Sequence, residues 1–322
     1  MSIRHGLRLL GCSTLIACLS ACGGGASDAG GSGSPNVIPG TTASVSTLGT
    51  RGETSQAYGA SAGNAGAVWQ DYDPPMLHEG MTTLPTQFIT MRDGVKLAVS
   101  VTLPADASGQ AVAGKFPVVL VQTSYNLSTG QYVAAIGGAD PYIVRHGYAT
   151  VVVDVRGTGN SQGTWDAFGE DEQADYGEVV DWVTSQAWSD GRIGLFGVSY
   201  LGITSVLTAE LQKPAVKAAF PIVPIGDGYR DIVFTGGQVN PTFIPIWMGL
   251  VTGLGALDFG ALQADPAMGL QTLVEHLVGA LVGFQVPTIL KALLGDEETA
   301  FDSDFWRIRS PLERARQINV PT

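Results

Sequence analysis

The strongest constraint on the fold comes from two continuous apolar segments in which polar and apolar residues do not alternate. They are Phe116–Val121 and Tyr148–Asp154, and both are rich in β-branched residues. Such segments are typical of strands that are buried on both faces of a mainly parallel sheet. Because parallel strands need long crossover connections, the sequence predicts helices between its strands.

The chain after residue 169 supplies this alternation. Helical periodicity appears between Glu170 and Trp188. The acids Asp171, Glu172 and Asp175 lie near its start, where the helix dipole favours negative charge. The elements expected next are a strand over Arg192–Gly197, a helix over Leu201–Leu211 and a strand over Ala215–Val223.

A β-hairpin is expected before the parallel strands. Two strand-like segments within Thr86–Leu103 flank Asp93-Gly94, a strong two-residue turn signal. The second segment alternates apolar and polar residues, as a half-buried antiparallel strand does. Together these patterns predict an α/β fold with a doubly wound, mostly parallel sheet that begins with an antiparallel hairpin.

Composition and charge exclude several classes of function. Hydrophobic residues make up 45% of the 322 residues and charged residues 14%, as expected for a globular chain with an apolar core. The formal net charge is −12 and no Lys/Arg-rich segment could follow a phosphate backbone, so nucleic acid is not an expected partner. The three cysteines, Cys12, Cys18 and Cys22, all lie at the N-terminus, which leaves no disulfide framework or cysteine-based metal site.

The N-terminus has the features of an export signal. Arg4 and Arg8 precede an apolar segment over Leu9–Leu19, which is too short to span a bilayer. The segment leads into Leu19-Ser20-Ala21-Cys22, which resembles the lipobox of bacterial lipoproteins. We therefore expect residues 1–22 to be a lipoprotein signal peptide, with Cys22 as the lipidated first residue of the mature protein. The alternative is an ordinary secretory signal that happens to contain cysteines.

A lipid anchor on Cys22 implies an exported protein that is attached to a membrane of the bacterial cell envelope. Gly23, and not Asp, follows the cysteine, which favours the outer membrane. Residues 23–80 are dominated by Gly, Ser, Ala and Thr and show no sustained periodicity. A flexible tether is therefore expected between the anchor and the folded part.

Ser199 is the candidate nucleophile, because it lies between an expected strand and an expected helix. It belongs to the hexapeptide Gly197-Val198-Ser199-Tyr200-Leu201-Gly202. A sharp strand-to-helix turn lifts a serine hydroxyl clear of the sheet, and the helix start offers backbone N–H groups to a developing oxyanion. Taken alone, the same turn is compatible with a serine that only caps the helix. The second glycine also lies one residue later than in the general Gly-x-Ser-x-Gly elbow.

The hexapeptide resembles the elbow of the CocE/NonD hydrolases, the family of enzymes that are similar to cocaine esterase and to X-prolyl dipeptidyl-peptidases. The resemblance covers residues 86 to about 320. Its further matches are Asp93–Leu97, Tyr125, Gly147–Ala149, Asp154–Gly163, Asp181-Trp182 and Gly191–Gly194. It implies an α/β-hydrolase core over residues 81–226 and a helical cap over residues 227–311. Residues 312–322 would then begin the return to the core.

The resemblance also implies two donors for an oxyanion hole, the Tyr125 hydroxyl and the backbone N–H of Tyr200. Two such donors stabilise developing negative charge, and each can contribute about 3 kcal/mol to lowering the barrier. Without the resemblance, Tyr125 is compatible with an ordinary tyrosine packed at a strand end.

The glycine-rich loop over residues 157–163 does not have the spacing of a dinucleotide-binding motif. In the resembling family this loop borders the active site. Beside it, we expect Asp154 and Arg156 to form a structural ion pair.

Apolar helical stretches dominate the expected cap, at Pro245–Leu257, Leu270–Phe284 and Thr288–Leu294. In the resembling family, an insertion at this place lies over the active site and shapes substrate choice. The alternative is a second helical core with no part in the chemistry.

A catalytic acid and histidine are not found in the expected chain order. In α/β-hydrolases the acid and then the histidine follow the serine. Only His276 follows Ser199, within an apolar helix-like stretch of the cap, and Asp227, Asp231 and Asp258 do not match the acid of the family. We therefore expect the acid, the histidine and a C-terminal domain to lie beyond residue 322, so that the fold is incomplete at its C-terminus.

The sequence thus predicts a serine hydrolase that cleaves an ester or an amide through an acyl-enzyme on Ser199. Its expected partner is a small-molecule ester or a peptide, cleaved after proline or as an amino-acid or xenobiotic ester. No metal or organic cofactor is implied. The alternative is a non-catalytic surface lipoprotein, or an inactive fragment, that retains the fold.

Overall fold

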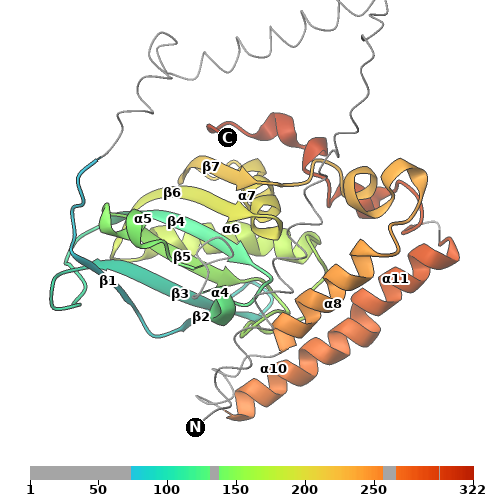
Figure 1. Ribbon diagram of the computed structural model, residues 1–322, viewed down its shortest axis with the longest axis horizontal. Coiled ribbons are helices and arrows are strands. Elements are labelled where there is room, and N and C mark those ends of the chain that lie inside the picture. The colour runs from blue at the N-terminus through green and yellow to red at the C-terminus, as the bar shows by residue number, and fades with distance from the viewer. Residues whose placement is uncertain (1–73, 131–137, 257–265, 297) are drawn as a thin grey trace, which may run out of the picture. The chain divides into compact units, whose positions relative to one another are not determined.

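The computed structural model describes residues 74–130, 138–256, 266–296 and 298–322 (Figure 1). The expected signal peptide, Cys22 and the tether up to residue 73 lie outside the described residues. Residues 75–322 form one compact unit. The folded unit therefore begins a few residues before the boundary expected at residue 80. Leu77 and His78 already donate backbone hydrogen bonds to the Arg145 carbonyl, at 2.9 and 3.0 Å.

A single sheet organises this unit. Its strands lie in the order β1 (Gly80–Thr83), β3 (Lys96–Ala105), β5 (Ala149–Asp154), β4 (Phe116–Thr123), β6 (Ser189–Val198) and β7 (Val216–Ile222), with β2 (Gln87–Thr90) paired to β3. Strands β5, β4, β6 and β7 pair in parallel, and β1, β2 and β3 pair antiparallel. The two continuous apolar segments are the central strands β4 and β5, and the prediction of a doubly wound, mostly parallel sheet is confirmed.

Strand β3 is more deeply buried than its alternating sequence suggests. It pairs with β1 and β2 on one side and with β5 on the other, so it lies inside the sheet. Its apolar face belongs to the main hydrophobic cluster. The other face is covered by α5 (Pro141–Arg145), and beyond the end of the β5 pairing the Ser161 hydroxyl accepts a hydrogen bond from Ala98 N–H at 2.8 Å. The expectation of a half-buried strand is therefore wrong, because small residues on the second face fit under a covering layer.

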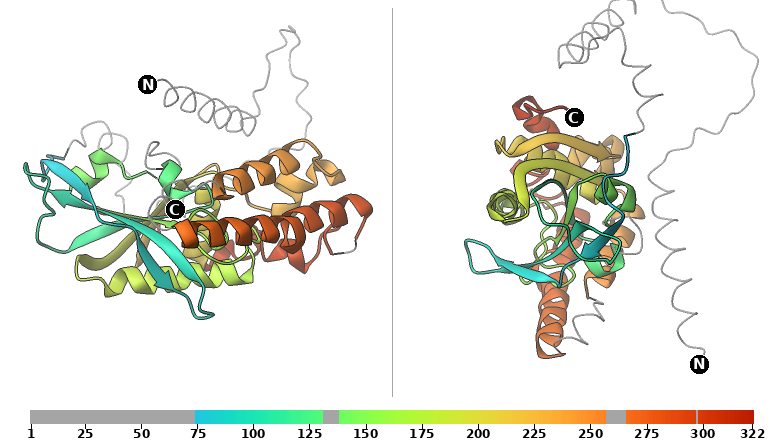
Figure 2. Two further views of the ribbon diagram at one scale, coloured as in Figure 1. Left: turned by 90° about the horizontal axis from the view of Figure 1, so that it is seen from below. Right: turned by 90° about the vertical axis from the view of Figure 1, so that its left-hand side faces the viewer.

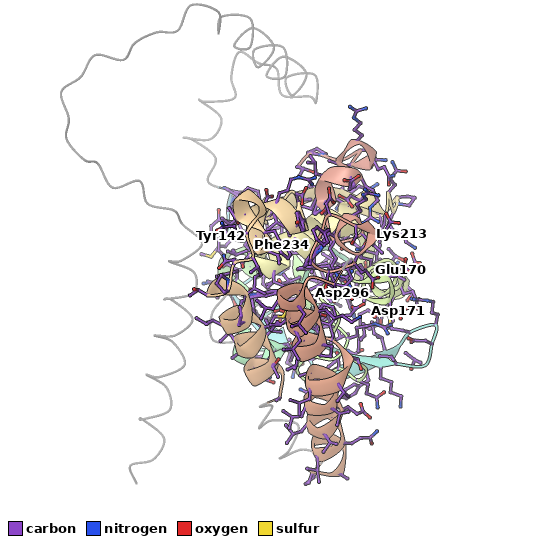
Figure 3. All side chains as sticks on the ribbon, turned by 90° about the vertical axis from the view of Figure 1, so that its right-hand side faces the viewer. Tyr142, Glu170, Asp171, Lys213, Phe234 and Asp296 are labelled. Atoms are coloured by element: carbon purple, nitrogen blue, oxygen red, sulfur yellow. The ribbon has the colours of Figure 1, made fainter. Side chains whose placement is uncertain are left out.

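Two helices pack side by side against β6. They are α6 (Glu170–Ser185) and α7 (Tyr200–Glu210), at the places where the sequence predicts helices. Acids occupy the first turn of α6, where the helix dipole stabilises negative charge. Glu170 and Asp171 lie together at this end of the helix (Figure 3).

The region expected to form a cap is helical. It contains α8 (Phe243–Ala256), α10 (Pro266–Val278) and α11 (Gln285–Leu294), with a π-helical segment over Gly279–Gly283. Helix α8 packs against α10, and Figures 1 and 2 show the three helices as one layer. The described part of this region also contains the short helices η2 (Gly228–Val233), η3 (Thr235–Gly237) and α12 (Asp304–Arg307).

Polar contacts join the helices of this cap to the core. Asn126 donates a side-chain hydrogen bond to the Leu254 carbonyl at 2.9 Å, and the His276 ring contacts the Ser161 carbonyl at 2.7 Å. Within the described part of the chain, Gly269–Leu294 is the one helix long and apolar enough to cross a membrane by length and composition. The buried contacts of His276 tie this helix to the core, as expected of a cap helix.

The last described residues return to the sheet. Two 3₁₀ turns, η5 (Pro311–Glu313) and η6 (Ala315–Gln317), lead to a segment in which Ile318 and Val320 pack against the main hydrophobic cluster. The Pro321 carbonyl accepts a hydrogen bond from Ala219 of β7 at 2.9 Å. The chain therefore runs beside β7 at this point.

Arg156 does not pair with Asp154, so the ion pair expected between them is wrong. The chain leaves β5 after Asp154, and the two side chains diverge. The Asp154 carboxylate accepts backbone hydrogen bonds from Leu127 and Asn160, at 2.6 and 3.0 Å. Arg156 instead makes a bidentate ion pair with Asp175 of α6, at 2.7 and 2.8 Å, and a third hydrogen bond to Asp93 at 3.0 Å. This cation links the β2–β3 turn to α6.

We expect Arg156→Leu to lower the free energy of unfolding by about 3–5 kcal/mol, because it leaves the buried carboxylate of Asp175 without its bidentate partner and with only the half-exposed Arg92 at 3.6 Å. The matched control is Arg192→Leu, which removes an exposed ion pair with Asp190 and should change stability by less than about 1 kcal/mol. Urea unfolding measures both values. Equal losses in the two variants would contradict the linking role of Arg156.

Candidate active site

Ser199 lies where the backbone reverses from strand β6 into helix α7. Its backbone angles are φ 58° and ψ −122°, in a region that non-glycine residues rarely occupy. The conformation is held from both sides, because Ser199 N–H donates to the Ile222 carbonyl at 2.9 Å and the Ser199 carbonyl accepts from Ile203 N–H at 3.0 Å. This is the strained strand-to-helix turn that a nucleophile elbow requires.

Two glycines allow the turn to be this tight. A Cβ atom on Gly197 would lie 2.3 Å from the backbone carbonyl of Leu201. A Cβ atom on Gly202 would lie 2.7 Å from the carbonyl oxygen of Ile222. The second contact explains why the second glycine lies three residues after the serine, since Gly202 is the residue of α7 that approaches β7.

Tyr125 is positioned by the loop that follows β4. Its backbone N–H donates to the Thr123 hydroxyl at 2.9 Å, and Asn126 next to it has a positive φ of 69°. The following residue, Leu127, donates its N–H to the Asp154 carboxylate at 2.6 Å. The acid after β5 therefore holds the loop after β4, at the carboxyl ends of two neighbouring parallel strands.

The Tyr125 hydroxyl meets the candidate nucleophile. It lies 3.2 Å from Ser199 Oγ, and Trp247 of α8 donates its indole N–H to the same hydroxyl at 3.3 Å. An indole nitrogen can only donate, so the Tyr125 oxygen accepts a hydrogen bond from Trp247. The same hydroxyl lies within hydrogen-bonding distance of Ser199 Oγ, and either oxygen of that pair can be the donor.

Tyr200 presents its backbone and its side chain to different surroundings. It is the first residue of α7, where backbone N–H groups have no partner within the helix. Its ring is fully buried and stacks on Phe168, with 4.3 Å between the ring centroids. Its hydroxyl donates to the Glu172 carboxylate and accepts from Trp165 Nε1 at 3.0 Å.

His276, Asp227 and Asp231 are engaged elsewhere. Both ring nitrogens of His276 face carbonyl oxygens, of Gly255 at 3.1 Å and of Ser161 at 2.7 Å. In the described part of the chain, Ser199 Oγ has no hydrogen bond to a histidine ring. Asp227 caps η2 and pairs with Arg230, and Asp231 accepts the backbone N–H groups of Gly226 and Asp227. Asp258 lies outside the described residues.

Within residues 74–130, 138–256, 266–296 and 298–322, no group of three or more His, Cys, Asp or Glu side chains could hold a metal ion.

Two residues of this site are not found by sequence reasoning. Trp247 lies in an apolar helical stretch whose inward face the sequence does not define. Glu172 is one of three consecutive acids at a helix start, a pattern that usually indicates a solvated helix end. Neither residue carries a motif, so only the packing of the cap and of α6 places them beside Tyr125 and Tyr200.

Known proteins share this arrangement of elements. The model of the family described as X-Pro dipeptidyl-peptidase (S15 family) matches residues 93–322. Cocaine esterase of Rhodococcus sp. (strain MB1 Bresler) is 30% identical over 247 residues, which are 72% of this chain and 41% of that protein. These matches confirm the resemblance to cocaine esterase-like and X-Pro dipeptidyl-peptidase-like hydrolases.

Solved structures agree with the sequence matches. A CocE/NonD family hydrolase from Staphylococcus aureus aligns with a TM-score of 0.56 and 27% identity, over 75% of this chain and 40% of that chain. An α-amino acid ester hydrolase aligns with a TM-score of 0.51 and 22% identity, over 78% of this chain and 43% of that one, which shows the fold alone. The α/β-hydrolase fold is therefore confirmed. The chain spans less than half the length of each of these three relatives.

We expect Gly197→Ala to destabilise the protein by about 2–3 kcal/mol or more, because the added methyl group would collide with the backbone of α7. Gly194→Ala, in the same strand, is the matched control. Its methyl group would approach only the Val118 carbonyl, at 3.9 Å, and should change stability by less than about 1 kcal/mol. Thermal and urea unfolding would show the difference, and similar losses in both variants would contradict the tight elbow.

Proposed function

Because the chain belongs to the X-Pro dipeptidyl-peptidase (S15) family, whose members are serine hydrolases, we propose that it cleaves an ester or an amide through an acyl-enzyme on Ser199. The observation that carries this proposal is the 3.2 Å contact between Ser199 Oγ and the Tyr125 hydroxyl at a strained strand-to-helix turn. A nucleophile and a donor for an oxyanion thus converge on one point. The substrate class is an ester or a peptide bond.

The reaction would begin with attack of Ser199 Oγ on the substrate carbonyl carbon. The carbonyl oxygen takes up negative charge as the new C–O bond forms, and the Tyr125 hydroxyl and the Tyr200 backbone N–H would donate hydrogen bonds to it. Collapse of this intermediate breaks the bond to the leaving alcohol or amine and leaves an acyl group on Ser199. Water then attacks the acyl group and regenerates the serine.

A base must accept the proton of Ser199 in the first step and return it to the leaving group. Both ring nitrogens of His276 face backbone carbonyls, so this histidine does not have the geometry of the base. We propose that the histidine and the acid that orients it follow residue 322, in agreement with the chain order Ser, acid, His.

We also propose that the protein is anchored in the bacterial cell envelope by a lipid on Cys22. The support is the string Leu19-Ser20-Ala21-Cys22 after a short apolar segment, followed by about fifty residues before the folded unit begins at Pro75. Such a linker would let the hydrolase work at a distance from the membrane surface.

For the catalytic proposal, the full product of the gene should react covalently with a fluorophosphonate probe, and Ser199→Ala should abolish the labelling. Tyr125→Phe should slow labelling and ester hydrolysis by about 10²–10³-fold, because it removes one oxyanion donor and keeps the ring. Tyr142→Phe, which changes an exposed hydroxyl on α5, should leave both rates unchanged.

Residues 1–322 alone should turn over substrate several orders of magnitude more slowly, because the proposed base is absent. Rapid hydrolysis by this chain that disappears in Ser199→Ala would contradict the position proposed for the base. It would still support Ser199 as the nucleophile. A folded full product that the probe does not label would overturn the catalytic proposal and favour a non-catalytic surface protein.

For the anchor, growth with an alkyne fatty acid should label the protein, and Cys22→Ser should remove the label and release the protein from the membrane fraction. Cys18→Ser, inside the expected signal peptide, should keep the label. A protein that stays membrane-bound and unlabelled would contradict the lipid anchor.

A further inference from the structure

A fully buried carboxylate lies behind the nucleophile elbow. Glu172, in the first turn of α6, has no exposed surface, and among the described residues it makes no ion pair. Asp166 lies close enough to oppose its charge, so the nearest acid adds to the penalty of burial. The charge of Arg309 attracts that of Glu172 but the two make no ion pair, so the carboxylate depends mainly on the hydrogen bonds that it accepts.

The Glu172 carboxylate accepts three hydrogen bonds. Its Oε1 accepts from the hydroxyls of Tyr200 and Tyr176, and its Oε2 accepts from Phe168 N–H at 3.1 Å. The direction of the Tyr200 bond follows from its two partners, because Trp165 Nε1 can only donate to the Tyr200 oxygen and the ionised carboxylate of Glu172 can only accept. The hydrogen of Tyr200 must therefore go to Glu172.

Protonation states agree with this direction. Burial and the charge of Glu172 raise the pKa of Tyr200 well above its ordinary value, so its hydroxyl keeps the hydrogen that it donates. Burial raises the pKa of Glu172 to about 7, while the hydrogen bonds from the two tyrosines act in the opposite direction.

Tyr200 is thus held at both ends of its side chain. At one end its peptide group directly follows Ser199 and opens α7, and at the other its hydroxyl is attached to Glu172 of α6. Between them, the ring is stacked on Phe168, and it lies 6.0 Å from the ring of Tyr125. A side chain with two rotatable bonds and both ends fixed leaves its own backbone little freedom to rotate.

We propose that Glu172 is a positioning residue that holds the Tyr200 backbone N–H in the direction of the oxyanion, by anchoring the far end of the Tyr200 ring. This inference rests on the proposed function of Ser199. Glu172 does not touch substrate in this scheme, because it acts through Tyr200. Preorganised donors are effective because they need no rearrangement during the reaction, and Glu172 would supply that rigidity from outside the elbow.

The two tyrosines on Glu172 provide a matched test. Tyr200→Phe and Tyr176→Phe remove the same group, from equally buried rings, and take a donor from the same carboxylate oxygen. Only Tyr200 belongs to the elbow. In the chain of residues 1–322, hydrogen exchange of the Ser199 and Ile203 amides should become about tenfold faster in Tyr200→Phe, relative to amides of β4. Tyr176→Phe should leave that ratio unchanged. Equal changes in the two variants, or no change in either, would overturn the proposal.

Substitutions of the carboxylate itself give a second comparison. Glu172→Gln keeps an oxygen that can accept from both tyrosines, whereas Glu172→Leu keeps none. The hydrogen-exchange rates of the Ser199 and Ile203 amides in Glu172→Gln should stay within about twofold of the wild-type rates. In Glu172→Leu these rates should rise as much as in Tyr200→Phe. If Glu172→Leu does not fold, the tyrosine pair decides the question.

Kinetics of the full gene product separate this inference from the proposed function. Tyr200→Phe should lower kcat for ester hydrolysis by about tenfold and leave KM nearly unchanged, and Tyr176→Phe should alter neither. A wild type that fluorophosphonate does not label contradicts the proposed function, while the exchange comparison still decides the role of Glu172. If the wild type is labelled but the exchange rates are equal in both tyrosine variants, Ser199 remains the proposed nucleophile and the positioning role of Glu172 is contradicted.

Discussion

The backbone reversal at Ser199 is the constraint on which the rest of the site depends. A serine with φ 58° is strained by about 1–3 kcal/mol and persists only when its surroundings determine it. Here β7 and α7 both bond to its peptide groups, and Gly197 and Gly202 let helix and strand approach more closely than any larger residue allows. The same reversal places the hydroxyl beside Tyr125 and starts α7 with Tyr200, so strain and function have one origin.

Two hydrogen-bond chains, each begun by an indole, orient the polar groups around this reversal. Trp247 donates to the Tyr125 oxygen, and the same hydroxyl lies within hydrogen-bonding distance of Ser199 Oγ. Trp165 donates to Tyr200, which directs the Tyr200 hydrogen to Glu172. Because an indole cannot accept, the first bond of each chain has only one possible direction. The first begins on α8, so a helix of the region expected to form the cap helps to orient the polar groups around Ser199.

Sequence reasoning succeeds where burial leaves a one-dimensional pattern. The central strands β4 and β5 are continuous apolar segments because both faces are covered, and Ser199 stands between strand and helix periodicity. Tyr125 is identified only through family resemblance. The predicted ion pair between Asp154 and Arg156 is wrong for a different reason. The two side chains are neighbours in sequence, but they point to different partners once the chain leaves β5. The roles of Trp247 and Glu172 depend on tertiary packing, which no local pattern records.

The most direct measurement of the central claim is a crystal structure of the full gene product after reaction with a phosphonate. The account predicts a covalent bond from phosphorus to Ser199 Oγ, with one phosphonyl oxygen within hydrogen-bonding distance of both the Tyr125 hydroxyl and the Tyr200 N–H. An adduct on another residue, or one whose phosphonyl oxygens point away from both donors, would contradict it.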